Sequence, residues 1–226
     1  MRCKVIYEDD YLIVILKPAG LATQTAKVGE ADVVSELKKY LRRDKEPYLG
    51  VVHRLDQPVE GLLVFAKDKK TAADLTKQLG QGTLNKQYYA VVCGKPKTSE
   101  GELVDYLYKD ANGKAAVTDA EGGLEKGAKK AVLQYRVVRE MESRPPIYLM
   151  DIHIDTGRFH QIRAQMSHAG MPLLGDKKYG TEDSIALSSQ RQVRTVALFA
   201  YSVAFVHPRS GKNMQYTVMP TEHPFQ

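Results

Sequence analysis

Residues 51–66 read VVHRLDQPVEGLLVFA, in which a polar segment lies between two apolar runs. The apolar residues 61–66 predict a buried strand. Asp56 stands in the loop before this strand, and such loops hold side chains on a rigid support while leaving them open to a cleft. Asp56 is therefore a candidate nucleophile or base. The alternative is a simple turn, in which its carboxylate accepts backbone hydrogen bonds beside Pro58.

The composition is that of a folded, basic protein. The 226 residues include 33 Lys and Arg against 27 Asp and Glu, and the formal net charge is +6. A positive balance favours polyanionic partners, because each cation that neutralises a phosphate releases counterions.

Cys3 and Cys93 show no paired spacing, so they predict neither a disulfide framework nor a zinc site, and a reducing compartment fits best. The apolar run 12–16 is too short for a signal sequence or a membrane span, and we expect a cytoplasmic protein.

The N-terminal part predicts two short strands and a helix. Residues 4–7 and 11–16 are the strands, and the acidic residues between them form a turn. Apolar residues recur at helical spacing over 33–41, at Val33, Val34, Leu37, Tyr40 and Leu41. The remaining face of this helix is basic and carries Lys38, Lys39, Arg42 and Arg43. It is either a solvated surface or a stripe that faces RNA.

The middle of the chain predicts a helix and a tyrosine-rich strand. Residues 71–79 form the helix, which ends at Gly80, where we expect a left-handed cap. Tyr88 and Tyr89 fall in a strand over residues 87–93 and therefore point to opposite faces. One tyrosine could face a cleft and stack on a base while its neighbour is core; alternatively, both are structural.

The remaining elements decide the fold class. Strands are expected over residues 131–141, 147–155, 195–206 and 214–218, and a short helix over 160–168. Strands and short helices interleave without a repeating βαβ unit, which favours an α+β fold with a mixed, largely antiparallel sheet. We expect a single domain over residues 1–226. Within it, residues 109–130 form a mobile loop or hairpin, which is either an RNA-contacting finger or an exposed connection.

A second polar segment, residues 151–163, reads DIHIDTGRFHQIR. His153, Asp155 and His160 are possible metal ligands, but they straddle a predicted strand-to-helix turn and match no ligand spacing, so we expect no metal. Arg163 is better explained as a fixed cation near the start of the helix. There it could pair with a carboxylate from another loop and lower its pKa.

Together, these segments resemble the RluA-type family of pseudouridine synthases. The shared blocks follow the family's order nearly from end to end. They are Lys17-Pro18-Ala19-Gly20-Leu21, His53-Arg54-Leu55-Asp56, Gly61-Leu62-Leu63-Val64-Phe65-Ala66-Lys67, Lys86-Gln87-Tyr88, Thr156-Gly157-Arg158, His160-Gln161-Ile162-Arg163, Gly175-Asp176, Tyr179-Gly180 and Phe205-Val206-His207-Pro208.

The resemblance implies the pseudouridine synthase fold with a central RNA-binding cleft, and it assigns the site. The family's essential catalytic aspartate falls on Asp56, its pocket tyrosine on Tyr88, and the arginine that pairs with the aspartate on Arg163. The same likeness predicts substrate contacts for His53, Arg54, Leu55 and Leu198.

The implied reaction breaks the C1′–N1 bond of a uridine, rotates the base and rejoins it through C5, without a cofactor. Asp56 would act ionised, either as a nucleophile toward C1′ or as the base that starts elimination to a glycal-like intermediate. The expected partner is ribosomal or transfer RNA, and the expected state is a monomer without metal. The rival functions are a catalytically silent RNA-binding module and a hydrolase of an N-glycosidic bond.

Three departures from the family pattern concern the substrate. The family usually has a threonine at Phe159, a Thr-Ser or similar pair at Val59-Glu60, and a histidine at Phe199. Such positions border the RNA-binding cleft in the family. The chain begins directly at the predicted catalytic strands, without an S4-like RNA-binding domain, so we expect the catalytic domain itself to select the RNA.

Overall fold

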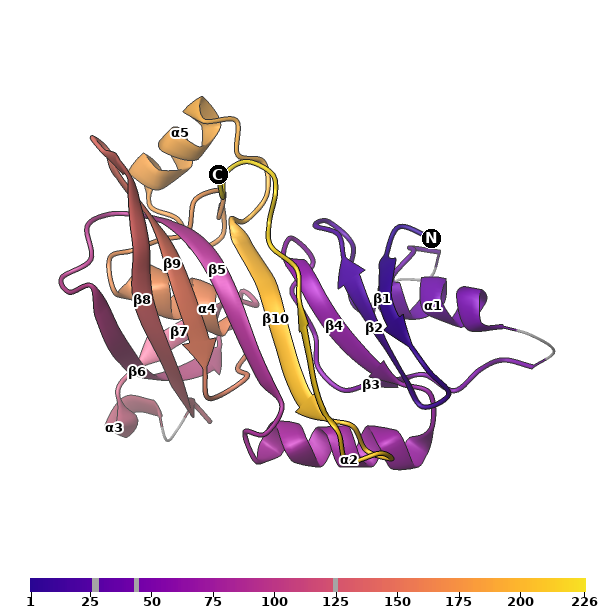
Figure 1. The fold of residues 1–226 in the computed structure, drawn as a ribbon. Coiled ribbons are helices and arrows are strands. Elements are labelled where there is room, and N and C mark those ends of the chain that lie inside the picture. Colours follow the sequence, from indigo (N-terminus) through magenta and orange to yellow (C-terminus); the bar gives the residue numbers. More distant parts are fainter. Residues whose placement is uncertain (26–28, 43–44, 124–125) are drawn as a thin grey trace. The chain divides into compact units, whose positions relative to one another are not determined.

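The computed structural model describes residues 1–25, 29–42, 45–123 and 126–226. The chain divides into two compact units (Figure 1). The first unit comprises residues 1–86 and 199–219, and the second comprises residues 87–198 and 220–226. That the chain acts as a single catalytic domain stays a prediction. Among the described residues, no helix is long and apolar enough to cross a membrane.

The first unit contains a mixed sheet with the strand order β1-β2-β4-β10-β11, and β3 pairs with β4. Its strands are β1 (Lys4–Glu8), β2 (Leu12–Lys17), β3 (Gly50–Val51), β4 (Glu60–Ala66), β10 (Leu198–Val206) and β11 (Asn213–Thr217). The described pairs of this unit are antiparallel except β4 with β10, which are parallel. This mixture confirms the α+β fold class with a mixed, largely antiparallel sheet.

Two helices accompany this sheet, α1 (Val33–Leu41) and α2 (Lys69–Gly80). Leu75 of α2 is fully buried in a core cluster with residues of β2, β4 and β10. The expected left-handed cap at Gly80 was wrong. Gly80 lies inside the helix, and Gly82 takes the positive φ of 73°. The residue that reverses the chain thus lies two positions later than expected.

Gly61 explains how the parallel pair of the first unit can form. It lies opposite Ala200 in the pairing of β4 with β10, and its φ is +141°. A Cβ at this position would lie 2.5 Å from the backbone nitrogen of Ala200. Only glycine tolerates both this φ and this approach. Gly61 thus fixes the strand that follows the loop of Asp56.

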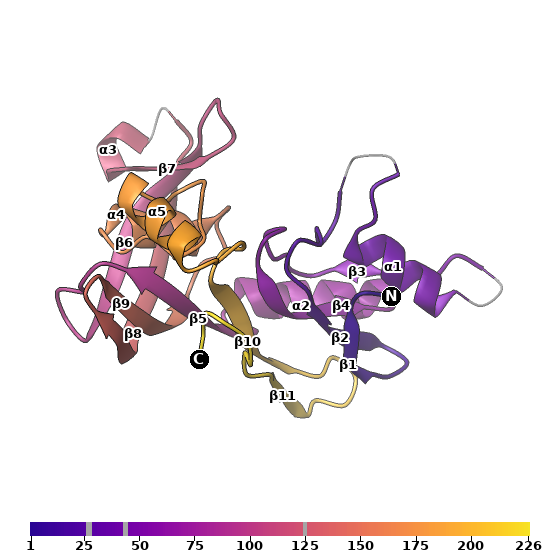
Figure 2. The same ribbon diagram turned by 90° about the horizontal axis from the view of Figure 1, so that it is seen from above.

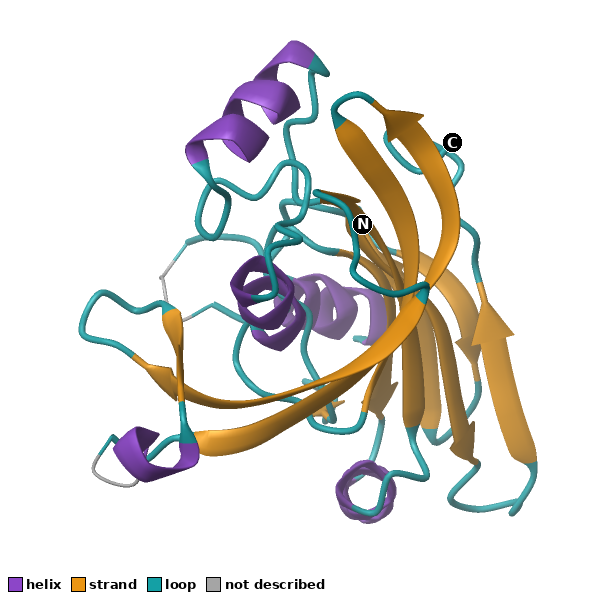
Figure 3. Cartoon of the chain, turned by 90° about the vertical axis from the view of Figure 1, so that its left-hand side faces the viewer, coloured by secondary structure: helices purple, strands orange, loops and turns teal. Residues whose placement is uncertain are grey.

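The second unit contains an antiparallel sheet with the order β5-β9-β8-β6-β7. Its strands are β5 (Asn85–Cys93), β6 (Glu100–Lys109), β7 (Ala115–Thr118), β8 (Lys129–Ser143) and β9 (Pro146–Ile154). Its helices are α3 (Ala120–Gly123), α4 (Gln161–His168) and α5 (Glu182–Gln190). Figure 3 shows how short the helices are compared with the strands.

Residues 109–130 contain more ordered structure than expected. β6 and β7 pair as an antiparallel hairpin whose turn includes Gly113, followed by α3. The mobility of residues 109–130 and their contact with RNA stay predictions. Residues 124–125 of this segment lie outside the described residues, as does Arg43 of the predicted basic helix face.

Candidate active site

The loop that carries Asp56 is fixed by a buried lysine. Lys17 is 0% exposed, and its ammonium group donates to the carbonyls of Pro18, Leu21 and Gln57 at 3.0, 2.7 and 3.2 Å. Burial lowers the pKa of Lys17 to about 8, although the interactions with Cys3, Asp56 and Glu60 act in the opposite direction. The buried ammonium group thus connects the loop of Asp56, through Gln57, to residues 17–21.

Further hydrogen bonds hold the residues on both sides of Asp56. The backbone N–H and carbonyl of Leu55 bond to the Thr23 hydroxyl at 3.2 and 2.8 Å. The N–H of Gly20 donates to the carbonyl of Gln57 at 2.8 Å. The half-buried Asp56 itself closes a turn, because its carbonyl accepts from the N–H of Val59 at 3.0 Å. The structure thus places the carboxylate on a turn whose backbone is held from both sides.

The neighbouring residues of this loop differ in exposure. His53 is 7% exposed, and its Nε2 accepts from the N–H of Val64 at 3.3 Å. Burial, together with the positive charge of Lys86, holds the pKa of His53 well below its usual range, so the imidazole is neutral. Arg54 is exposed and Leu55 is buried. Substrate contacts of these three residues stay predictions.

The remaining predicted site residues belong to the second unit. Tyr88 lies on β5 opposite Ile152 of β9 and is 4% exposed. Tyr89 faces the other side of the strand and is half-buried. Leu198 is buried at the start of β10. Tyr88 is thus the more buried tyrosine of the pair. Its role as the pocket tyrosine stays a prediction.

Arg163 is clamped by a carboxylate that the sequence did not assign to it. Its Nε and Nη2 donate to the two oxygens of Asp176 at 2.6 and 2.8 Å. Arg163 is 5% exposed and Asp176 is 1% exposed, so this is a buried ion pair. The guanidinium also lies 5.0 Å from the ring centre of Tyr179. The pairing of Arg163 with Asp56 stays a prediction, because the two residues belong to different units.

The segment before Arg163 is organised by Gln161, the first residue of α4. Its side-chain carbonyl accepts from the Thr156 hydroxyl at 2.8 Å and from the N–H of Arg158 at 2.9 Å. Its amide donates to the carbonyl of Val132 on β8 at 3.0 Å. The predicted strand-to-helix turn is thus anchored to the sheet of the second unit.

The three possible metal ligands are engaged in other contacts. His153 Nε2 lies 3.2 Å from an oxygen of Asp155. His160 Nδ1 lies 2.8 Å from the hydroxyl of Tyr179. Within the part of the chain that the structure describes, no group of three potential ligands could hold a metal ion.

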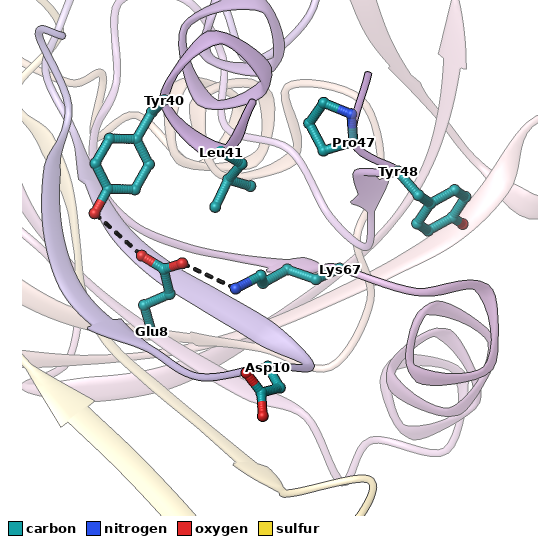
Figure 4. A pocket seen from close by; sticks show the side chains of 7 residues that line it. All are labelled: Glu8, Asp10, Tyr40, Leu41, Pro47, Tyr48 and Lys67. Carbon is teal, nitrogen blue, oxygen red and sulfur yellow. Dashed lines mark hydrogen bonds and ion pairs between the residues drawn. The ribbon is translucent and has the colours of Figure 1, made fainter. Parts of the chain in front are cut away.

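A pocket of about 570 Å³ in the first unit lies away from Asp56. Its walls include Tyr40, Tyr48 and Lys67. The carboxylate of Glu8 points into it, where it accepts from the Tyr40 hydroxyl at 3.1 Å and from Lys67 at 2.9 Å (Figure 4). Lys67 follows the last residue of β4, whereas Asp56 precedes the first, and a strand of seven residues spans about 20 Å. This pocket is therefore not part of the Asp56 site.

Comparison with known families finds a match over most of the chain. A family model described as RNA pseudouridylate synthase matches residues 11–168, which is more than half of the chain. The chain belongs to this family. The matched region contains Asp56, Tyr88 and Arg163, so all three candidate catalytic residues lie within the pseudouridylate synthase region.

Curated relatives agree with an RluA-type pseudouridine synthase. Ribosomal large subunit pseudouridine synthase C of Buchnera aphidicola is 32% identical over 93% of this chain and 65% of its own length. RNA pseudouridine synthase 2, chloroplastic, of Oryza sativa is 32% identical over 96% of this chain and 62% of its own length. The chain thus spans less than two thirds of the length of these relatives.

Solved structures support the same fold. Human RNA Pseudouridylate Synthase Domain Containing 4 has a TM-score of 0.74 at 23% identity, covering 96% of this chain and 88% of that one. Human RNA Pseudouridylate Synthase Domain Containing 1 has a TM-score of 0.77 at 17% identity, covering 96% and 83%. At these identities the likeness shows the pseudouridine synthase fold.

Sequence reasoning missed two groups that organise the site. Lys17 and Asp176 were named as members of blocks shared with the family, with no role assigned to either. Both are charged residues next to apolar runs, LIVIL before Lys17 and PLLG before Asp176. A charge in that position signals burial with a compensating partner, but the sequence does not name the partner.

Proposed function

We propose that this chain is an RNA pseudouridine synthase that isomerises specific uridines of ribosomal RNA, with transfer RNA as the alternative substrate. Membership of the pseudouridylate synthase family supports the reaction. Two matched relatives carry the name ribosomal large subunit pseudouridine synthase, C in one case and D in the other, and they favour ribosomal RNA. The free, buried Cys3 and Cys93 are consistent with action in the reducing cytosol.

The observation that carries the proposal is the fixed loop of Asp56. A catalytic carboxylate must be held close to its productive position, and here the flanking Leu55 and Gln57 are bonded to residues 17–23. We assign Asp56 as the ionised carboxylate that attacks C1′ or acts as the base that starts elimination. In either route N1–C1′ breaks, C5–C1′ forms, and the proton lost from C5 balances the one gained at N1. This isomerisation consumes no cofactor.

The second unit supplies the other proposed roles. Arg163 would pair with Asp56 and keep it ionised, because a nearby positive charge favours a carboxylate. Its fixed clamp on Asp176 supports this role, since a preorganised guanidinium needs no reordering. Tyr88 would stack on the uracil, and its buried position on β5 suits a pocket wall.

The RNA itself would be held by charge. The exposed Arg54, next to the loop of Asp56, and the lysines of α1 would contact phosphates. His53, Leu55 and Leu198 would shape the pocket from buried positions. We propose that the enzyme acts as a monomer without metal.

The test is pseudouridine formation by purified protein on ribosomal and transfer RNA, read by mass spectrometry of the nucleosides. Wild type should convert uridine in one RNA class, and Asp56→Ala should lower the rate by about 10²–10⁴-fold or more, because it removes the reacting carboxylate. Asp56→Ala should keep its fold and RNA affinity, since a loop carboxylate contributes little to the core and only repels phosphates.

The same assay separates the rival functions. A hydrolase would release free uracil, which chromatography detects, whereas an isomerase releases none. A silent RNA-binding module would bind RNA without converting uridine. Substantial turnover by Asp56→Ala would overturn the assignment of the catalytic residue.

A further inference from the structure

Phe159 is an exposed aromatic ring at the turn before α4. It is 44% exposed. Its ring stacks on that of His160, with 3.8 Å between centroids and 21° between planes. His160 therefore covers one face of the ring. Single exposed apolar residues are common, so exposure alone assigns no function.

The backbone holds this ring in its position. His160 has φ 51° and ψ 29°, a left-handed conformation that few residues other than glycine adopt. The hydroxyl of Tyr179 accepts from the N–H of Ala115 at 2.7 Å and lies 2.8 Å from His160 Nδ1. A less favourable backbone state that its surroundings maintain points to a use for the side chains it presents.

A chain of contacts leads from the exposed ring to the candidate catalytic arginine. Phe159 stacks on His160, whose ring meets Tyr179 edge-on at 5.6 Å. The ring of Tyr179 in turn lies 5.0 Å from the guanidinium of Arg163. All four residues belong to the second unit. The exposed ring is thus the outer end of the packing around Arg163.

The ammonium groups of two lysines lie over the ring of Phe159. The ammonium of Lys109, at the end of β6, lies 5.4 Å from the ring centre of Phe159, and that of Lys178 lies 6.0 Å away. Lys178 is held by the carbonyl of Gly113 at 2.6 Å, in the β6–β7 turn. α4 packs against β6 and β7, which brings these segments together (Figure 2). An aromatic platform beside cations is the arrangement that binds single-stranded nucleic acid, because bases stack and phosphates pair with ammonium groups.

We propose that Phe159 stacks on an unpaired nucleobase of the RNA substrate, while Lys109 and Lys178 contact the adjoining phosphates. This inference rests on the proposed function, because it names a contact to the RNA. It makes Phe159 a binding residue that this chain has in place of the family's threonine. The base it holds is a different one from the target uridine, which is assigned to Asp56 and Tyr88.

The test compares the affinity of Phe159 variants for a short fluorescein-labelled oligouridylate and for the duplex of that strand with oligoadenylate. Phe159→Leu keeps an apolar side chain but removes the aromatic face, so it should weaken single-strand binding by about 5- to 100-fold, the range expected for one stacked base. Phe159→Trp should bind the single strand about as tightly as wild type, because it keeps an aromatic face. Duplex affinity should not change, because its bases are already stacked.

Two further variants complete the test. Lys109→Gln should reduce the slope of log affinity against log salt by about 0.7, the value for one phosphate contact to a single strand. Val138→Ala is the matched control, because Val138 is also 44% exposed and lies on β8 of the same unit. It should bind like wild type. Thermal unfolding of each variant checks that the fold is kept.

The outcomes separate this inference from the proposed function, because binding requires no turnover. Equal single-strand affinity of Phe159→Leu and wild type would overturn the stacking role, as would no measurable binding of oligouridylate by wild type at low salt. If wild type forms no pseudouridine but the Phe159 effect persists, the proposed reaction fails and the binding site stands. If pseudouridine forms and Phe159→Leu binds normally, the proposed reaction stands and the binding site fails.

Discussion

The two segments that carry the candidate site are held by two buried cations, Lys17 and Arg163. Lys17 donates to three backbone carbonyls at 2.7–3.2 Å and thereby ties the loop of Asp56 to residues 18–21. Arg163 forms two bonds to the carboxylate of Asp176 at 2.6 and 2.8 Å. The first cation is thus satisfied by dipoles, and the second by an opposite charge.

This difference determines how each segment responds to pH. Carbonyl dipoles compensate a buried charge only in part, and burial lowers the pKa of Lys17 to about 8. An arginine keeps its proton throughout the range in which proteins fold, and its planar fork matches a carboxylate. The loop of Asp56 is therefore held by a charge that can be titrated, and the turn of Arg163 by one that cannot.

The largest expected effect is on activity. Arg163→Ala should reduce pseudouridine formation about 100-fold or more, because it removes a fixed positive group proposed to keep Asp56 ionised. Arg163→Lys should recover little of this loss, since a lysine cannot reproduce the two-donor fork. Single-turnover rates on the RNA substrate measure both variants. A fully active Arg163→Lys enzyme would show that charge alone suffices.

The next effect is on stability. Asp176→Ala should lower the free energy of unfolding by about 3–5 kcal/mol, because it leaves the guanidinium of Arg163 buried without its carboxylate. The exposed pair of Arg136 with Asp151, 3.3 Å apart in the same unit, is the control. Arg136→Ala should cost less than about 1 kcal/mol.

Urea denaturation measures these free energies of unfolding. The double variant Arg163→Met with Asp176→Leu should recover part of the stability lost in Asp176→Ala, since no unpaired charge is left. Its activity should remain as low as that of Arg163→Ala. Equal costs for Asp176→Ala and Arg136→Ala would contradict the importance of the buried pair.

The smallest expected effect is the pH dependence of stability to which Lys17 contributes. Its pKa is about 8 in the folded protein against an ordinary 10.5, so the unfolded chain binds more protons between these values. The free energy of unfolding should therefore rise with pH above 8. The pKa of Cys3 and of Cys93 is raised by burial to about 11 from 9.0, which lowers stability as pH rises above 9. The effect of the lysine on the free energy of unfolding is therefore best measured between pH 8 and pH 9, below the range in which the cysteines oppose it.

Denaturation at several pH values in this window gives the slope. Lys17→Met should show a smaller rise than wild type, because it removes one of two buried lysines with a lowered pKa, the other being Lys86. Lys39→Met, an exposed lysine of α1 in the same unit, is the matched control. Identical slopes for wild type and Lys17→Met would refute the titration of Lys17.

The strands and helices were predicted where local pattern and burial agree. The apolar residues before Lys17 and after Gly61 became β2 and β4, and the segment after Phe159 became α4. β3, β6, α3 and α5 were missed. β6 alternates polar and apolar residues only weakly, and α5, with the sequence EDSIALSSQ, is rich in serine. In such segments tertiary contacts rather than intrinsic propensity decide the structure.

By itself the sequence determined the fold class and the candidate residues Asp56, Tyr88 and Arg163, because motif order and hydrophobic period are properties of the chain. Only the tertiary structure decided what holds those residues, since a partner distant in sequence is chosen by folding. It gave Arg163 the carboxylate of Asp176 and placed the carbonyl of Gln57 on Lys17. Buried charges require partners, but which partner meets them depends on how the strands and turns pack.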